Sequence, residues 1–146
     1  MSVAFGWGPV EARALVPDPT ACLVVVDVLS FTTAAGVSEE RPLAVIASGE
    51  RWPDGSLRPV LEDHLGAGAV LDALRTLAPG HHLTPEATAA ATPWAATDDP
   101  VAALHGCDSG RELYEYGYPQ DVEVAAETDA STAVPVLVDG AFTEAP

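Results

Sequence analysis

The feature of this sequence that most constrains its fold is an unbroken apolar run at residues 22–26, rich in valine and followed directly by Asp27. A second unbroken apolar run covers residues 43–47. Strands with one solvent-exposed face alternate apolar and polar residues, whereas unbroken runs of branched apolar residues are typical of parallel strands that are buried on both faces. The two runs therefore predict buried, parallel strands in an α/β protein.

Helical patterns occupy most of the remaining chain. The longest starts at Pro59 and continues to about residue 77, with apolar residues recurring at helical spacing. Ser109 and Glu112 have the spacing of a capping box at the start of another helix. Shorter helices are predicted at residues 9–15, 32–40 and 119–127, after Thr84 and near Asp98.

The remaining strands and connections indicate how these elements are organised. Short strands are predicted at residues 3–5 and 134–138, the second at a sheet edge because Pro135 has no amide hydrogen. The sequence contains no internal repeat and no linker long enough to separate two domains. We therefore expect residues 1–146 to form a single domain, a three-layer α/β/α fold with a mixed, mostly parallel sheet.

The charge of the chain excludes several classes of partner. It has 22 acidic residues against six arginines and no lysine, which gives a net charge of −16. Such a surface repels nucleic acids and anionic membranes, so we expect neither as a partner. There is no signal-peptide pattern, no membrane-spanning apolar run and no metal-binding cysteine spacing, so we expect a cytoplasmic protein with free thiols. An anionic substrate would require a metal ion or arginines to reverse the field locally.

Asp27 stands where a ligand site is expected in an open α/β sheet, beyond the carboxyl end of a strand. A carboxylate there can hold a divalent metal ion or act as a nucleophile. The hydroxyls of Ser30, Thr32 and Thr33 can contact a phosphate. Asp27 or Ser30 can equally cap the predicted helix that follows, and the local sequence leaves both interpretations open. Haloacid-dehalogenase-type phosphatases need a second Asp where this chain has Leu29, which excludes a standard enzyme of that type.

Glu62 and Asp63 are adjacent acids in the first turn of the longest predicted helix. Acids at this position stabilise the helix dipole, and Glu62 lies four residues after Arg58, so the local spacing favours a structural role. The alternative is a hard-cation site, in which both carboxylates and Asp27 offer oxygen ligands to Mg²⁺.

Three of the six arginines lie near predicted helix starts, namely Arg51, Arg58 and Arg111. A cation at that end of a helix is mildly unfavourable, and a phosphate or sulfonate partner would explain the placement. The segment Ser109-Gly-Arg111 has the composition of an anion-binding turn, although a capping box accounts for Ser109 equally well.

Several ordered strings of this sequence resemble the 2-phosphosulfolactate phosphatase family. They are Phe5-Gly-Trp-Gly-Pro9, residues 24–33, residues 49–59 together with 61–63, and residues 109–113 through Asp121 to residues 134–135. The resemblance implies a Mg²⁺-dependent phosphomonoesterase that hydrolyses 2-phospho-3-sulfolactate to sulfolactate and phosphate, a step of coenzyme M biosynthesis. It implies Asp27, Glu62 and Asp63 as the catalytic and metal-binding set. It implies contacts to a small anionic phosphorylated substrate from Ser30, Thr32, Arg58, Ser109 and Arg111.

The chain is shorter than the family it resembles. Members carry a large middle segment with a Ser-Pro-Asn-Gly loop, whereas only nine residues separate Thr33 from Leu43 here. We therefore expect a fold reduced relative to the family. Two functional predictions follow: an active phosphatase, or a catalytically impaired relative that acts as a binding or oligomerising module. The second would self-associate through apolar surface that lost strands leave exposed, which makes a homo-oligomer its expected state.

Overall fold

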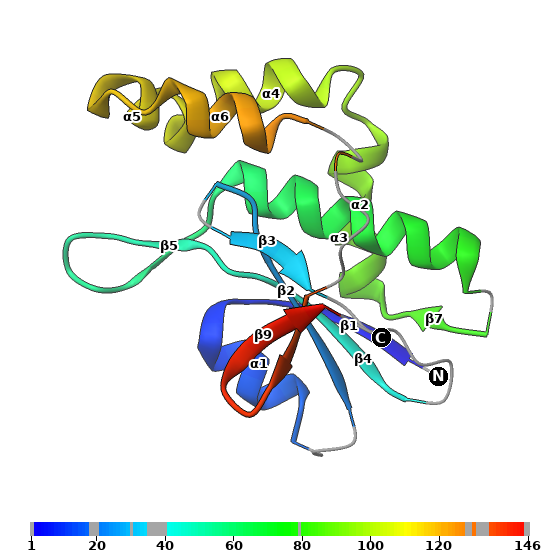
Figure 1. The fold of residues 1–146 in the computed structure, drawn as a ribbon. Coiled ribbons are helices and arrows are strands. Elements are labelled where there is room, and N and C mark those ends of the chain that lie inside the picture. The colour runs from blue at the N-terminus through cyan, green and yellow to red at the C-terminus, as the bar shows by residue number, and fades with distance from the viewer. Residues whose placement is uncertain are drawn as a thin grey trace.

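The computed structural model describes residues 2–17, 21–29, 31–34, 41–78, 80–127, 130 and 135–144 (Figure 1). Its main sheet has five strands in the order β3-β2-β4-β1-β7. β1, β2, β4 and β7 run parallel, and β3 is antiparallel to β2. The predicted mixed, mostly parallel sheet is therefore confirmed. The strands are β1 (Ser2–Trp7), β2 (Cys22–Asp27), β3 (Phe31–Ala34), β4 (Leu43–Ala47) and β7 (His82–Leu83).

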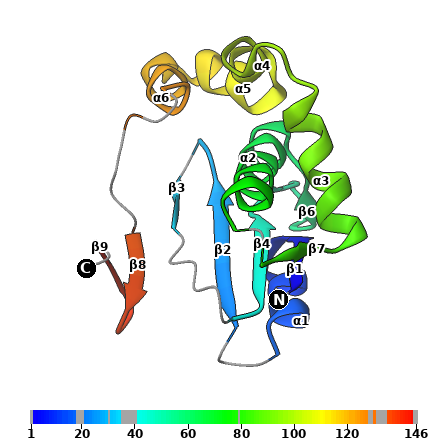
Figure 2. The same ribbon diagram turned by 90° about the vertical axis from the view of Figure 1, so that its right-hand side faces the viewer.

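Helices cover both faces of this sheet, as Figures 1 and 2 show. α2 (Leu61–Leu77) and α3 (Pro85–Ala95) lie side by side on one face, over a core that includes Val24, Val26 and Leu71. α1 (Gly8–Leu15) lies on the other face, where it packs mainly on β1 and β4. The predicted three-layer α/β/α architecture is confirmed.

The two central apolar runs differ in how far they are buried. All five residues of β4 are buried, as the unbroken run predicts. In β2 only Val24 and Val26 are buried, whereas Leu23 and Val25 remain 38% and 44% exposed. The prediction that this strand is covered on both faces is wrong, because α1 packs mainly on its neighbours β1 and β4.

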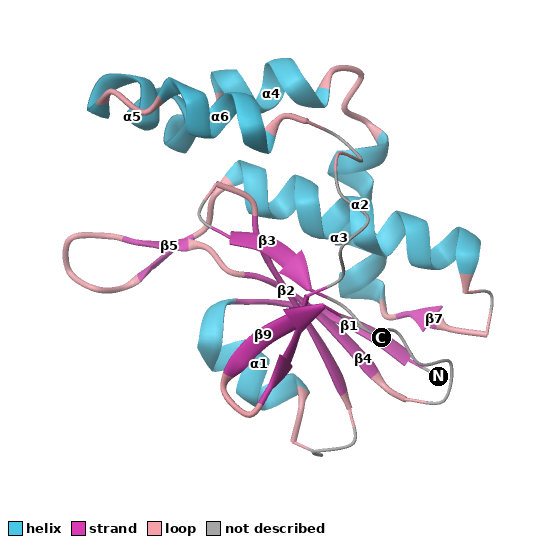
Figure 3. Cartoon of the chain, in the orientation of Figure 1, coloured by secondary structure: helices cyan, strands magenta, loops and turns pink. Residues whose placement is uncertain are grey.

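Three short helices form a separate layer beyond the carboxyl end of β2 (Figure 3). Leu104, Cys107 and Val122 make a small core there, against which Val28 and Leu29 pack. The N-terminal end of α2 contacts the same group through Glu62. These helices are α4 (Pro100–Gly106), α5 (Asp108–Tyr116) and α6 (Pro119–Ala125), and we call them the α4–α6 segment.

Two hairpins complete the described fold. β5 (Glu50–Arg51) pairs with β6 (Leu57–Arg58), and β8 (Pro135–Val138) pairs with β9 (Ala141–Glu144). Within the described residues β8 has β9 as its only strand partner, so it forms a separate hairpin rather than the predicted edge of the main sheet. No helix in the described ranges is both long and apolar enough to cross a membrane.

Two local predictions are wrong. Residues 31–34 form β3 rather than the start of a helix, because this segment turns back and pairs with β2, while residues 35–40 lie outside the described part of the chain. The capping box is also absent. Cys107 is the N-cap of α5, its sulfur accepts the Gly110 amide, and Glu112 instead binds Arg58.

Candidate functional site

Asp63 ties the start of α2 to the loops that follow β2 and β4. Its Oδ1 accepts the Val28 amide at 2.8 Å and its Oδ2 accepts the Gly49 amide at 2.7 Å. The side chain is buried, and this loss of solvation raises its pKa to about 6, although the two amide hydrogen bonds act in the opposite direction. Asp63 therefore fixes the backbone at the carboxyl edge of the sheet.

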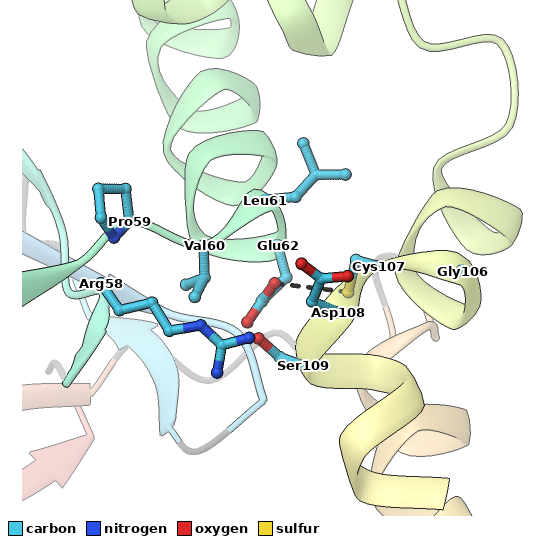
Figure 4. Close-up of a pocket in the computed structure, with 9 residues that line it drawn as sticks. All are labelled: Arg58, Pro59, Val60, Leu61, Glu62, Gly106, Cys107, Asp108 and Ser109. Carbon is cyan, nitrogen blue, oxygen red and sulfur yellow. Dashed lines mark hydrogen bonds between the residues drawn. The ribbon is translucent and has the colours of Figure 1, made fainter. Parts of the chain in front are cut away.

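Glu62 is buried in the first turn of α2 and faces a pocket of about 300 Å³. One wall of the pocket comes from the segment that leads into α2, and the other from the junction of α4 and α5 (Figure 4). Its lining residues are Arg58, Pro59, Val60, Leu61, Glu62, Gly106, Cys107, Asp108 and Ser109. Because α2 and α5 both begin at this pocket, the N-terminal ends of two helices, which carry partial positive charge, lie beside it.

Ser109 is the least satisfied polar group at this pocket. The residue is only 3% exposed, and among the described residues its hydroxyl has no hydrogen-bond partner. Figure 4 shows that hydroxyl pointing towards the end of the Arg58 side chain. A buried hydroxyl without a partner costs free energy, so the position of Ser109 favours a bound polar ligand in the pocket.

Arg58 supplies the positive charge of the pocket, and acids from two elements hold it. Its two terminal nitrogens both donate to Glu112 of α5 at 2.9 Å, and one also donates to Glu50 of β5 at 2.9 Å. The guanidinium also lies 5.0 Å from the centre of a Trp52 ring. The hydrogen bonds that Arg58 donates to Glu112, and then the charges of both acids, raise the pKa of Arg58, which therefore stays charged.

Cys107 is a pocket residue without nucleophilic character. Its thiol contacts Glu62 Oε2 at 3.4 Å and the Leu104 carbonyl at 3.1 Å, and its sulfur accepts the Gly110 amide. Burial, with the nearby Glu62 charge, raises the pKa of this thiol to about 11. The reactive form of a cysteine is the thiolate, so at neutral pH Cys107 acts as a structural hydrogen-bonding group.

Of the remaining predicted site residues, Asp27 and Arg111 are described and do not line the pocket. Asp27 ends β2 and lies close enough to raise the pKa of Asp63 by its charge. Arg111 is mostly exposed and donates to Asp108 and to the Gly106 carbonyl. Thr32 lies in β3, and its side chain and the whole of Ser30 fall outside the described part of the chain.

The acids do not form a closed metal cage. Within the described ranges, no group of three or more His, Cys, Asp and Glu side chains is placed to hold a metal ion. Asp63 directs both oxygens at backbone amides, whereas Glu62 faces the pocket. Mg²⁺ commonly takes only one or two protein carboxylates and completes its shell with water and substrate phosphate. The donors therefore fit an ion held by Glu62 and a bound phosphate, and do not fit a site made of Asp27, Glu62 and Asp63 alone.

Local sequence analysis missed two contributors to this site, Cys107 and Glu112. Cysteine is an uncommon N-cap, so nothing in its flanking residues marks Cys107 as the start of α5. Glu112 matched a capping-box pattern, and its true partner Arg58 is 54 residues away in the sequence. A long-range contact of this kind has no signature in local spacing.

Comparison with known proteins shows which family this chain belongs to. Residues 33–140 match the family model of 2-phosphosulpholactate phosphatase, a stretch that contains every residue that lines the pocket. A search of curated proteins found no match. Since the matched stretch covers well over half of the 146 residues, the family predicted from the ordered strings is confirmed. The chain therefore belongs to the 2-phosphosulpholactate phosphatase family, a family of phosphoric monoester hydrolases.

Proposed function

We propose that this chain is a phosphomonoesterase that binds the phosphoryl group of a small phosphorylated acid between α2 and α5. The observation that carries the proposal is the buried, unpaired Ser109 hydroxyl, which shares the pocket with Arg58 and two helix N-termini. Each of these groups donates hydrogen bonds, and phosphate oxygens accept them. Membership of a phosphatase family supports the reaction.

The groups around the pocket would have two different roles, to orient the phosphoryl group and to position the attacking water. Arg58, Ser109 and the amides at the start of α5 would orient the phosphoryl oxygens. Glu62, with its buried carboxylate, can accept a hydrogen bond from a water molecule and hold it for attack on phosphorus. Such positioning, together with stabilisation of negative charge, accounts for most of the rate enhancement in phosphoryl transfer.

The charge of the pocket supports a requirement for Mg²⁺. Arg58 is balanced by Glu50 and Glu112, and Glu62 and Asp108 add negative charge to the lining. A phosphate dianion therefore needs further positive charge to enter. Bound Mg²⁺ would neutralise the phosphoryl oxygens and make phosphorus more electrophilic, with Glu62 as its protein ligand. Asp63, another predicted ligand, would hold the backbone beside the ion through its bonds to the Val28 and Gly49 amides. Asp27, the third predicted ligand, would add negative charge near Asp63 at the carboxyl edge of the sheet.

The substrate follows from the family. We propose 2-phospho-3-sulfolactate, cleaved in the cytoplasm to sulfolactate and phosphate in the biosynthesis of coenzyme M, with no nucleic acid or membrane as partner. The −16 net charge of the chain is in keeping with a small, diffusible substrate rather than an anionic polymer.

The decisive experiment is phosphate release from 2-phospho-3-sulfolactate with added MgCl₂ or with EDTA. We expect Mg²⁺-dependent release by the wild type. Glu62→Gln and Arg58→Gln should lower kcat/KM by about 100-fold or more, which is the order expected for groups that stabilise developing charge. Asp27→Asn tests the predicted acid at the sheet edge. Glu115→Gln is the control, because Glu115 is an exposed acid of α5 away from the pocket. Equal activity in all five proteins would contradict the assignment.

The half-exposed β2 supports a second function. Leu23 and Val25 form an apolar strip on a central strand, which fits the alternative of a shortened, catalytically impaired relative that self-associates. That alternative predicts an oligomer without phosphate release, whereas the phosphatase predicts turnover whatever the oligomeric state. Light scattering combined with the activity assay separates them.

A further inference from the structure

The ion pair between Arg58 and Glu112 joins the two sides of the pocket. Arg58 ends β6 on the sheet side of the pocket, and Glu112 projects from α5 on the other side. Both terminal nitrogens of Arg58 are engaged, each with its own oxygen of the Glu112 carboxylate at 2.9 Å. The Arg58 side chain is only 13% exposed, so this bidentate pair is partly shielded from solvent.

A carboxylate in this position imitates a phosphate. The two terminal nitrogens of a guanidinium form a planar fork that matches carboxylate and phosphate oxygens in the same bidentate way. In this structure Glu112 occupies that fork, while Ser109, at the same pocket, has no partner among the described residues. The anion-binding group of the pocket is therefore already bound to an anion of the protein itself.

We propose that Glu112 competes with the phosphoryl group of the substrate for Arg58 and thereby sets how tightly the pocket binds anions. This inference rests on the proposed function, because it takes the pocket to be the phosphate site. Substrate binding would release Glu112 from Arg58 and transfer the fork to two phosphoryl oxygens. The Ser109 hydroxyl would then gain the partner that it lacks among the described residues.

The competition has a chemical consequence for selectivity. Release of Glu112 costs the free energy of a charge-assisted bidentate pair, and only an anion that replaces both hydrogen bonds recovers it. A phosphate monoester can do so with two oxygens. A singly charged ligand with one available oxygen cannot, so Glu112 would exclude weak anions from the pocket.

The test measures the binding of inorganic phosphate by calorimetry, with MgCl₂ present, to the wild type and to Glu112→Gln. The variant removes the competing charge and should bind phosphate about fivefold or more tightly, with a matching decrease in KM for the substrate. A merely structural role for Glu112 would weaken binding instead. Glu115→Gln makes the same change of charge on the same helix, away from the pocket, and should bind phosphate like the wild type.

Further variants separate failure of this inference from failure of the proposed function. Arg58→Gln should lose phosphate binding, and if it binds like the wild type, the pocket is not the phosphate site. If Arg58→Gln loses binding while Glu112→Gln binds no more tightly than the wild type, the competition is overturned. Glu112→Asp keeps the charge but shortens the side chain, and should tighten binding to a smaller extent. It gives the answer if Glu112→Gln does not fold, as judged by circular dichroism.

Discussion

Asp63 is a buried acid that binds two backbone amides, and its titration should change the free energy of unfolding with pH. Burial raises its folded-state pKa from 3.8 to about 6. A raised pKa means that between these values the folded state binds more protons than the unfolded state, so the contribution of Asp63 to stability falls as pH rises. It is fully present below about pH 4 and is lost as pH passes about 6.

The matched comparison is Asp63→Asn, which cannot titrate. The free energy of unfolding of the wild type, minus that of the variant, should be largest near pH 4 and should decline through pH 6. Asparagine offers one acceptor oxygen to the two amides of Val28 and Gly49, so one hydrogen bond is lost. This loss lowers the free energy of unfolding of the variant by the same amount at every pH. Urea unfolding across this range measures the difference, and a difference that is independent of pH would contradict the assignment.

His81 carries a second test at the scale of a single residue. It is 5% exposed, and neither ring nitrogen has a hydrogen-bond partner among the described residues. An unpaired buried polar group is destabilising, so His81→Leu should raise the free energy of unfolding by about 1 kcal/mol. His82→Leu changes the exposed neighbour in β7 and should alter it by less than about 0.5 kcal/mol. Loss of stability in His81→Leu would mean that the imidazole has a partner in solution.

At the scale of elements, the close packing of α2 on α3 depends on Gly68. A Cβ at this position would lie 2.9 Å from the Trp94 Cβ and 3.0 Å from the Ala90 carbonyl. Gly68→Ala should therefore lower the free energy of unfolding by about 1–3 kcal/mol, although alanine is the better helix former. Gly106→Ala, in α4 with open space around it, should raise it by about 0.5–1 kcal/mol. Thermal unfolding compares the two, and equal signs would contradict this account of the helix contact.

The elements also show how far local sequence determines this fold. The apolar runs of β2 and β4 and the long α2 follow from spacing alone, because each contains its own pattern. β3 does not, since residues 31–34 become a strand only by pairing with β2. Local sequence also cannot predict the contacts of the site, because the amide partners of Asp63 are 35 and 14 residues away in the sequence. Local spacing therefore placed Glu62 and Asp63 in the first turn of α2 and favoured a structural role for both, but could not show that they perform different tasks.

In the whole molecule the pocket between α2 and α5 lies at the carboxyl edge of the sheet, where an open α/β fold is expected to bind ligands. The unexpected feature is an exposed apolar strip on β2. A central strand keeps apolar side chains in solvent at Leu23 and Val25, while the chain as a whole carries a net charge of −16. Apolar attraction between copies and charge repulsion between them therefore oppose one another, and salt weakens only the repulsion.

This balance predicts self-association that increases with salt. Light scattering should show a larger mean mass at about 0.5 M NaCl than at about 0.02 M, where the screening length is far longer. The double variant Leu23→Thr, Val25→Thr keeps branched, strand-forming residues but makes the strip polar, so it should remain monomeric at both concentrations. Val10→Thr is the control, because Val10 is 75% exposed on α1 and is not part of β2. A wild type that stays monomeric at high salt would show that this exposed strand does not drive association, and would leave the pocket as the functional surface of the chain.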